Sequence, residues 1–484
     1  MGHVSALSAA GDLVSILRGF NPWWARRPFE VPEFRRLAFQ ICNRRLRDQQ
    51  LRRAVLLTGP RRVGKTTILT QIAKSWVEEG RDPKSILYLS LDHPILKLAS
   101  LSEILRLYHE NVHPEGKATV LLLDEVQYAD EWDFHVKQLI DRKPEYRILA
   151  TGSASVVQRH QLVDTGVGRW TRVPIPTLSF YEFLRIRGDE LPGIADNMRP
   201  VDLFRKTPAD LGDIGERSRS LMPLFRRYLL VGGFPETAHH PDIAFCQRLL
   251  REDVVERVLK RDMTALFGIR NVNDLERLFI YLCLNSGGIF STQTCAKELG
   301  ATTATVGNHL EALEHANLIY RLRPSALGGK KVLKARYKVY LVDAALCNAV
   351  LLRGEEIIDD PGQVGPIVET TILRHLFAYH YQDTPQILYW RDAKSGREVD
   401  IVVKSPKYTI PVEVKYRADA SLSEKDGIVE YCRAENPSFA YCITQQERDF
   451  DLRNIPGVKT KLLRVPAHIF AYLIGQAERA LWAS

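Results

Sequence analysis

The sequence predicts an α/β protein whose first part is built on a parallel β-sheet. Four short apolar runs, at residues 54–58, 85–91, 120–123 and 146–150, are typical of buried strands. A stretch with helical spacing, residues 66–79, lies between the first two runs. Strands that alternate with helices form parallel sheets joined by helical crossovers, so we expect that architecture up to about residue 180.

The middle of the chain favours helices followed by a β-hairpin. Residues 178–263 have a helical pattern, within which a Gly-, Pro- and charge-rich stretch at 188–220 is predicted to be an insertion. Beyond it the sequence predicts helices at 274–285, 291–299 and 303–316, then strands at 318–322 and 336–342 around a Gly328–Gly329 turn. Three helices followed by a hairpin are the outline of a winged helix.

The last part of the chain returns to a mixed α/β pattern from about residue 361. Its strand-like runs are 386–390, 399–403, 410–414 and 439–443. At the other end, residues 1–50 are basic and helical in pattern, and we predict that Trp23 and Trp24 pack in a core rather than stack on bases. The 484 residues suffice for about three domains of roughly 100–200 residues each.

Composition and charge restrict the class of protein only broadly. Hydrophobic residues make up 45% and charged residues 26%, as in ordinary globular proteins. The formal net charge of +9 is compatible with a polyanionic partner, although many basic proteins bind no nucleic acid. No apolar stretch reaches the roughly 18–20 residues that span a bilayer, and residues 1–10 lack a secretory signal pattern. We therefore expect no membrane association.

The seven cysteines indicate a reducing compartment. Their number is odd and none forms a C-x-x-C pair, so neither a disulfide framework nor a zinc site is indicated. Reduced thiols are typical of cytoplasmic proteins, and we expect that location. The cysteines are Cys42, Cys246, Cys283, Cys295, Cys347, Cys432 and Cys442.

A phosphate-binding motif lies between the first predicted strand and the following helix. It matches G-x-x-x-x-G-K-[ST], in which loop amides and a helix N-terminus bind phosphate groups. We expect Lys65 to meet the β- and γ-phosphates of ATP and the Thr66 hydroxyl to bind Mg²⁺. The nucleotide-binding residues are Gly59, Pro60, Arg61, Arg62, Val63, Gly64, Lys65, Thr66 and the adjoining Thr67.

Two acids that follow the strand at 120–123 complete the predicted ATP site. We expect Asp124 to hold the Mg²⁺ shell and Glu125 to polarise the attacking water, whereas Gln127 faces the γ-phosphate or caps the next helix. Ser153, after the next strand, is a candidate sensor of the γ-phosphate. Arg169 is a candidate arginine finger toward a neighbouring subunit, with a solvated arginine as the alternative.

These motifs resemble the AAA-type prokaryotic ATPases with a C-terminal DUF4143 domain. The resemblance runs from about residue 20 to the end and is specific in its combination of motifs. It implies an AAA-like core, a helical lid, a winged helix and a restriction-endonuclease-like C-terminus, without fixing a cellular role. The motifs are the phosphate loop, residues 123–127 with Trp132, residues 151–153, Gly168 with Arg169, residues 178–183 and residues 232–236.

The chain accordingly divides into five predicted parts. Each is bounded by a change in the pattern of strands and helices. They are a helical extension (1–50), a P-loop AAA-like core (51–180), a helical lid with an insertion (181–270), a winged helix (271–345) and a nuclease-like α/β domain (346–484).

Acids and a lysine in the last part resemble the PD-(D/E)-x-K nucleases. Glu413 and Lys415 are two apart on a predicted strand and so share one face of the sheet. Asp400 and Glu413 are predicted ligands of Mg²⁺ or Mn²⁺, which would bind phosphate and lower the pKa of water. Lys415 would orient the water, and Glu369 would complete the cluster. E-x-K is a common tripeptide, and a retained fold with decayed chemistry is the alternative.

The predicted winged helix offers a second nucleic-acid surface. Winged helices also serve as protein-packing modules, which is the alternative. The polar residues proposed to meet DNA are Thr302, Thr303, Thr305, Asn308 and His309 on the helix, and Lys330, Lys331, Lys334 and Arg336 on the hairpin.

The leading prediction is therefore an ATP-hydrolysing enzyme that acts on nucleic acid, DNA rather than RNA. It would be a homo-oligomer with a metal-dependent C-terminal nuclease. One alternative is a regulatory ATP switch whose C-terminal domain binds partners. The other is a DNA-remodelling ATPase that does not cut.

Overall fold

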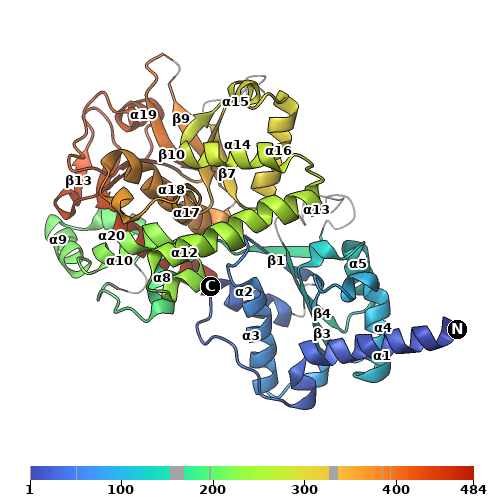
Figure 1. Ribbon diagram of the computed structural model, residues 1–484. Helices are drawn as coiled ribbons and strands as arrows, with labels where there is room; N and C mark the ends of the chain where they lie inside the picture. Colours follow the sequence, from blue (N-terminus) through green and yellow to red (C-terminus); the bar gives the residue numbers. More distant parts are fainter. Residues whose placement is uncertain are drawn as a thin grey trace. The chain divides into compact units, whose positions relative to one another are not determined.

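The computed structural model describes residues 2–48, 50, 52–152, 168–195, 198–325, 336–383, 385–392 and 394–483. These residues form two compact units, Met1–Ile175 and Pro176–Trp482. Each unit has its own β-sheet (Figure 1).

The first unit is a five-stranded sheet with helical crossovers. Its strand order is β2-β3-β4-β1-β5, and all neighbouring strands are parallel. The predicted parallel sheet is thus confirmed. The strands are β1 (Ala54–Thr58), β2 (Ile86–Ser90), β3 (Thr119–Asp124), β4 (Tyr146–Gly152) and β5 (Trp170–Pro174). The helices are α1 (Gly2–Phe20), α2 (Leu37–Arg47), α3 (Lys65–Glu78), α4 (Leu101–Asn111) and α5 (Trp132–Arg142).

The N-terminal extension covers the edge strand β2. The Asn21 side chain accepts a hydrogen bond from the amide of Tyr88 at 2.7 Å and donates to its carbonyl at 2.9 Å. The indoles of Trp23 and Trp24, both buried, donate to the carbonyl of Ile86 at 3.0 and 2.8 Å. These contacts satisfy backbone groups that an open sheet edge leaves unpaired. The predicted packing role of both tryptophans is confirmed.

The second unit begins with helices. A run from α12 continues through π-helical turns at 250–262 into α13, which Figure 1 draws as one long helical rod. The helices are α8 (Phe180–Arg187), α9 (Pro208–Arg217), α10 (Leu221–Val231), α11 (Pro235–His239), α12 (Ile243–Leu249), α13 (Met263–Phe267), α14 (Val272–Leu284), α15 (Thr292–Leu299), α16 (Thr303–His315), α17 (Ala345–Leu351), α18 (Pro361–His380), α19 (Gly427–Glu435) and α20 (Ala467–Ala483).

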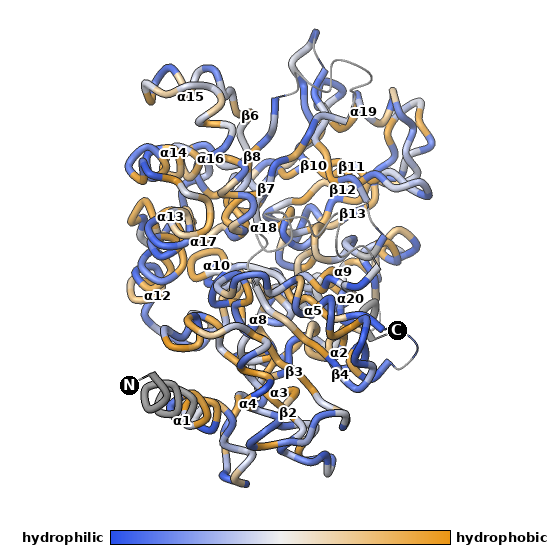
Figure 2. The backbone as a smooth tube through the Cα atoms, turned by 90° about the vertical axis from the view of Figure 1, so that its right-hand side faces the viewer, coloured by the Kyte–Doolittle hydropathy of each residue, from blue (hydrophilic) through white to orange (hydrophobic). Residues whose placement is uncertain are grey.

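A nine-stranded mixed sheet runs through the rest of the second unit, in the order β13-β14-β12-β11-β10-β9-β7-β8-β6. Strands β10 and β12 are almost wholly buried, and Figure 2 shows hydrophobic stretches along this part of the chain. The strands are β6 (Gly288–Phe290), β7 (Ile319–Pro324), β8 (Tyr337–Leu341), β9 (Gln386–Arg391), β10 (Glu398–Lys404), β11 (Thr409–Lys415), β12 (Phe439–Thr444), β13 (Asp451–Asn454) and β14 (Lys461–Pro466).

The segment predicted as a winged helix has the expected three helices and two strands. Its strand β8 pairs with β7 and with the short β6, and β7 also pairs with β9. The strands of this segment therefore belong to the same sheet as the proposed nuclease strands. The winged-helix assignment itself stays a prediction, as does the five-part division of the chain.

The predicted insertion at 188–220 contains regular structure. It includes a 3₁₀ segment, Pro200–Arg205, and α9, whose N-terminus has a capping box between Thr207 and Asp210. The seven cysteines are buried and unpaired, in agreement with the predicted free thiols. Among the residues described, no helix combines the length and apolarity that crossing a bilayer requires.

Candidate ATP site and C-terminal acidic cluster

The phosphate-binding loop leaves β1 and enters α3. A Cβ atom on Gly59 would collide with the carbonyl oxygen of Ile175, so only glycine fits where the chain passes the end of β5. Arg62 and Gly64 have left-handed backbones, with φ 63° and 92°. These turns bring the loop to the N-terminus of α3, where the helix dipole favours negative charge.

Lys65, the first residue of α3, is buried beneath this loop. Its ammonium group donates to the carbonyls of Gly59 at 3.0 Å and Pro60 at 2.7 Å. Its side chain is therefore folded over the concave side of the loop rather than extended into solvent. This geometry is compatible with the predicted contact to the phosphates of ATP.

Asp124, at the end of β3, is the centre of a hydroxyl network. Thr66 donates to Asp124 Oδ2 at 2.6 Å, Tyr88 donates to the same oxygen at 3.1 Å, and Thr151 donates to the other oxygen. Burial raises the pKa of Asp124, as does the neighbouring charge of Glu125, while the hydrogen bonds from Thr151 and Thr66 oppose the rise. The carboxylate is thus fixed in place before any ligand binds.

Glu125 turns away from the strand immediately after Asp124. Its backbone is left-handed, with φ 56°, and its amide donates to the Thr151 hydroxyl at 3.1 Å. The side-chain amide of Gln127 donates to the Glu125 carboxylate. Gln127 therefore orients the predicted water-polarising group, a contact that neither of its two predicted roles included.

The Mg²⁺ ion predicted here fits the residues present. A hydroxyl and a carboxylate, from Thr66 and Asp124, lie within 2.6 Å of each other. Mg²⁺ prefers oxygen ligands and is usually held by one or two carboxylates together with substrate phosphates. Bound there with ATP, the ion would neutralise charge on the phosphates.

The structure does not place the other two residues predicted for the ATP site, Ser153 and Arg169, in the network around Asp124. Ser153 lies outside the described residues. Arg169 precedes β5, and its guanidinium pairs with Asp141 of the same chain at 2.7 Å. The hydrogen bond that Arg169 donates to Asp141 raises the pKa of Arg169, despite some opposing desolvation. An arginine finger at this position would first have to leave that carboxylate.

Residues before the loop also position it. The buried Arg36 donates to the Val63 carbonyl at 3.0 Å, and Gln71 of α3 donates to the carbonyls of Pro32 and Phe34 at 2.6 and 2.9 Å. The sequence analysis assigned no functional residue to this extension, because a single arginine in a basic segment cannot be told from an ordinary surface residue.

In the second unit the predicted acids come from three elements. Glu369 lies on α18, Asp400 on β10, and Glu413 on β11 with Lys415. Glu369 and Asp400 are brought together by one cation, the buried Lys338 of β8, whose ammonium nitrogen is 2.9 Å from both carboxylates. The sequence analysis did not include Lys338.

The surroundings of Lys338 hold it firmly. A third carboxylate, that of Glu398, is 3.4 Å from its nitrogen, and the Lys338 side chain is only 2% exposed. The Tyr340 hydroxyl donates to Glu369. Burial alone would lower the pKa of Lys338, but Asp400 and Glu369 raise it well above its usual value. The lysine is therefore charged.

The remaining nuclease residues have other partners. The backbone amide of Val414 donates a hydrogen bond to the Asp400 carboxylate at 2.9 Å. Lys415 donates to the Asp426 carboxylate, whose pKa burial would raise but Lys415 lowers. Burial, together with Asp400, raises the pKa of Glu413 well above its usual value, and one of its oxygens is buried without a partner among the described residues.

Comparisons with known proteins agree with the resemblance seen in the motifs. Residues 51–184 match the model of an AAA domain, and residues 364–464 match the domain of unknown function DUF4143. The chain thus contains an AAA domain and a C-terminal DUF4143 domain. Between these, residues 222–356 match a second domain of unknown function, DUF8612.

Two relatives of similar length bear the name uncharacterized protein. One from Methanocaldococcus jannaschii is 25% identical, over 74% of this chain and 75% of its own length. One from Haemophilus influenzae is 21% identical, over 77% and 85%. Among solved structures, Aeropyrum pernix ORC1 in complex with DNA covers 68% of this chain and 96% of its own, at 12% identity and a TM-score of 0.30. AMPPCP-bound DnaA from Aquifex aeolicus covers 59% of this chain and 89% of its own, at 17% identity and a TM-score of 0.24.

The metal predicted for the DUF4143 domain does not fit the residues that surround its position. The ammonium group of Lys338 already lies between Glu369 and Asp400 and offsets one of their two negative charges, and Lys415 is bound to Asp426. Among the described residues, no group of three or more carboxylate, imidazole or thiol side chains is arranged to hold a metal ion. Glu369 has its pKa raised to about 7, first by burial and then by Asp400.

The candidate DNA-binding helix is only partly available to a ligand. Thr302, Thr303 and Asn308 are exposed, but His309 is buried, and burial lowers its pKa. The Thr302 and Thr305 hydroxyls bond to each other at 2.9 Å at the start of α16. On the hairpin, Arg336 is exposed, whereas Lys330, Lys331 and Lys334 lie outside the described residues.

Proposed function

We propose that the protein is an ATP-hydrolysing switch, in which the AAA domain turns over ATP with Mg²⁺ and the DUF4143 domain binds a partner without cutting it. The arrangement of Lys65, Thr66 and Asp124 around the phosphate loop carries this proposal. ATP hydrolysis is the activity expected of an AAA domain.

In this proposal each residue at the loop has one task. The loop amides and the N-terminus of α3 bind the phosphates, and Lys65 offsets negative charge that develops on them in the transition state. Glu125, oriented by Gln127, orients the attacking water and takes its proton. Asp124 and Thr66 hold the ion that bridges to the phosphates.

The proposed partner is nucleic acid, and DNA rather than RNA. The net charge of +9 supports a polyanionic partner, because phosphate contacts by basic residues supply affinity without sequence reading. The exposed Thr303 and Asn308 of α16 add polar groups able to meet a nucleic acid.

A metal-dependent nuclease is the second candidate function. The convergence of Glu369, Asp400 and Glu413 on one region of the sheet favours it, as does the unpartnered oxygen of Glu413. The presence of Lys338 among the acids weighs against it, and so the non-cutting function is preferred.

A cleavage assay separates the two candidates. Linear, circular and branched DNA would be incubated with the protein and Mg²⁺ or Mn²⁺, with and without ATP. We expect no cleavage, with DNA retained in a gel-shift assay to an extent that depends on ATP. Cleavage that disappears in Asp400→Ala and in Lys415→Ala, but persists in the exposed β10 variant Lys404→Ala, would replace the binding function by the nuclease.

The proposed homo-oligomer is tested through Arg169. If Arg169 acts on a neighbouring subunit's ATP, Arg169→Ala and Glu125→Gln proteins should each be slow but recover part of the ATP turnover when mixed, because some interfaces then hold both intact residues. The ion pair with Asp141 is solvent-screened, so it contributes little and can be broken easily. Arg172→Ala, on an exposed position of β5, is the matched control. Turnover by Arg169→Ala at the wild-type rate removes the role.

A further inference from the structure

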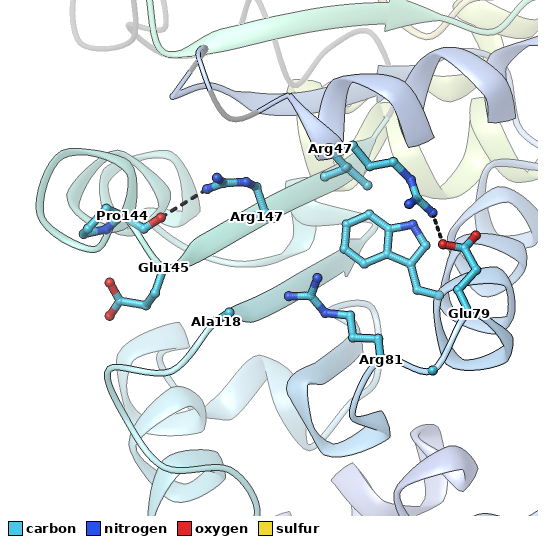
Figure 3. A pocket seen from close by; sticks show the side chains of 10 residues that line it. Arg47, Glu79, Arg81, Ala118, Pro144, Glu145 and Arg147 are labelled. Atoms are coloured by element: carbon cyan, nitrogen blue, oxygen red, sulfur yellow. Dashed lines mark hydrogen bonds and ion pairs between the residues drawn. The ribbon is translucent and has the colours of Figure 1, made fainter.

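A basic pocket lies at the end of the first unit's sheet where β3 and β4 begin. Its volume is about 690 Å³, within the range of roughly 300–1,000 Å³ that small-molecule sites occupy. Figure 3 shows three arginines around it, Arg47 from α2, Arg81 from the turn after α3 and Arg147 from β4. The lining residues are Leu46, Arg47, Trp76, Glu79, Gly80, Arg81, Ala118, Pro144, Glu145 and Arg147.

Positive charge in the pocket exceeds the negative charge that faces it. The carboxylate of Glu79 forms an ion pair with Arg47, at an N–O distance of 2.5 Å. Arg81 donates to the Ser85 hydroxyl at 3.3 Å, and Arg147 donates to the carbonyls of Pro144 and Tyr146 at 3.1 and 3.0 Å. Within the described part of the chain, neither Arg81 nor Arg147 forms an ion pair. In Figure 3 the Glu145 carboxylate is directed away from both.

The guanidinium groups are held in place before a ligand arrives. Those of Arg47 and Arg81 lie over the Trp76 ring, 5.1 and 4.8 Å from its centroid. The ring is buried, and its nitrogen donates to Asn43 at 2.6 Å. Burial lowers the pKa of Arg81, and the charges of Arg147 and Arg47 lower it further, so a negative ligand would relieve repulsion among the three arginines.

A favourable interaction with helix dipoles explains only two of these three arginines. Arg47 is the last residue of α2 and Arg81 follows the C-terminal end of α3, positions at which positive charge is favoured by the helix dipole. Arg147 belongs to a strand, and the dipoles of those helices give no reason for a third guanidinium to face the same space.

We propose that this pocket binds a small ligand with two adjoining phosphate groups, such as a pyrophosphate or the diphosphate of a nucleotide. The planar guanidinium groups of Arg81 and Arg147 present paired donors that match phosphate oxygens. The Trp76 ring holds the guanidinium group of Arg81 in place, and the open side of the pocket admits the rest of the ligand. This site is separate from the P-loop and does not depend on the proposed ATP turnover.

The pocket is joined to the ATP site by continuous secondary structure. Helix α3 runs from Lys65 to Glu78, about 20 Å at 1.5 Å per residue, and the residues that follow it line the pocket. Strands β3 and β4 likewise begin at the pocket and end at Asp124 and Gly152. A ligand in the pocket thus touches the far ends of the elements that carry Lys65 and Asp124.

The test is a calorimetric titration with inorganic pyrophosphate of protein whose P-loop is saturated with a non-hydrolysable ATP analogue and Mg²⁺. We expect one further saturable binding event per chain. Arg147→Gln should weaken it at least about tenfold, since a charge-assisted hydrogen bond is worth that much. Arg147→Gln removes no contact to the Trp76 ring. Arg81→Gln should weaken pyrophosphate binding similarly, but it also removes a guanidinium group that packs on that ring.

A matched control is Arg106→Gln, on the exposed face of α4 in the same unit, which removes one charge elsewhere. Thermal melting verifies that each variant is folded. The proposal is overturned if wild-type protein takes up no pyrophosphate beyond the analogue. It is also overturned if Arg106→Gln weakens pyrophosphate binding as much as Arg147→Gln does. The same holds if neither Arg147→Gln nor Arg81→Gln weakens that binding.

Discussion

Replacing Lys65 by alanine should lower ATP turnover by at least about 100-fold, the loss that follows removal of one well-placed transition-state donor. The Lys65 ammonium lies under the loop within 3.0 Å of two of its carbonyls. A truncated side chain removes both the cation that meets the phosphates and the groups that hold the loop closed. Steady-state phosphate release and fluorescent-nucleotide binding would measure the two effects separately.

Lys74→Ala is the matched control for this prediction. Lys74 lies on the same helix, is partly exposed, and forms only a long contact of 3.9 Å with Glu78. Its loss should leave turnover within about twofold of wild type, since exposed pairs contribute about 0–1 kcal/mol. Retained turnover in Lys65→Ala would remove the phosphate-site assignment, and equal losses in both variants would indicate damage to α3.

The ATP site could be predicted from the sequence because its motifs are contiguous. The loop, Lys65 and Thr66 fall within eight residues, and Asp124 and Glu125 follow an entirely apolar strand. Parallel strands end at one edge of a sheet, so the meeting of Thr66 with Asp124 follows from the order of elements. Arg36 was not found, since its contact with Val63 depends on how the N-terminal extension folds back on the loop. Tyr88 was not found either, although β2 lies beside β3 and its hydroxyl donates to Asp124.

The strands were predicted well where they are wholly apolar and missed where they are not. β1, β3 and β4 agree with their predicted runs within two residues. β5 was missed because Trp170 to Pro174 contain no apolar run and only Val173 among them is buried. β6 is three residues long, and β13 is polar and half-exposed at the sheet edge.

The C-terminal cluster shows what a sequence pattern omits. Glu369, Asp400 and Glu413 were identified from their order and spacing, and two of them do meet. Lys338 was overlooked, because a lysine in a hairpin strand reads as a solvent-facing residue. One signal was available: Lys338 and Tyr340 are two apart on β8, so both face the same side of the sheet as a possible polar pair.

Replacing Lys338 by methionine should destabilise the second unit and create a site for a divalent cation. Methionine has a similar length but no charge, so it leaves Glu369 and Asp400 without their shared counter-ion, while Glu398 keeps its contact with Arg391 at 3.7 Å. Removing one partner of a buried ion pair typically costs about 3–5 kcal/mol. Oxygen ligands of this kind favour Mn²⁺ or Mg²⁺, and a bound ion would restore the lost charge balance.

The expected result is a melting temperature that falls in Lys338→Met and recovers with millimolar Mn²⁺, accompanied by Mn²⁺ binding in electron paramagnetic resonance. Wild-type protein and the exposed variant Lys404→Met should show neither effect. In the double variant Lys338→Met, Glu369→Gln, stability should return in part without Mn²⁺, because one uncompensated carboxylate has been made neutral. Equal Mn²⁺ binding by wild-type protein would show that Lys338 does not take the place of a metal ion, and the nuclease would then become the better explanation of this acidic cluster.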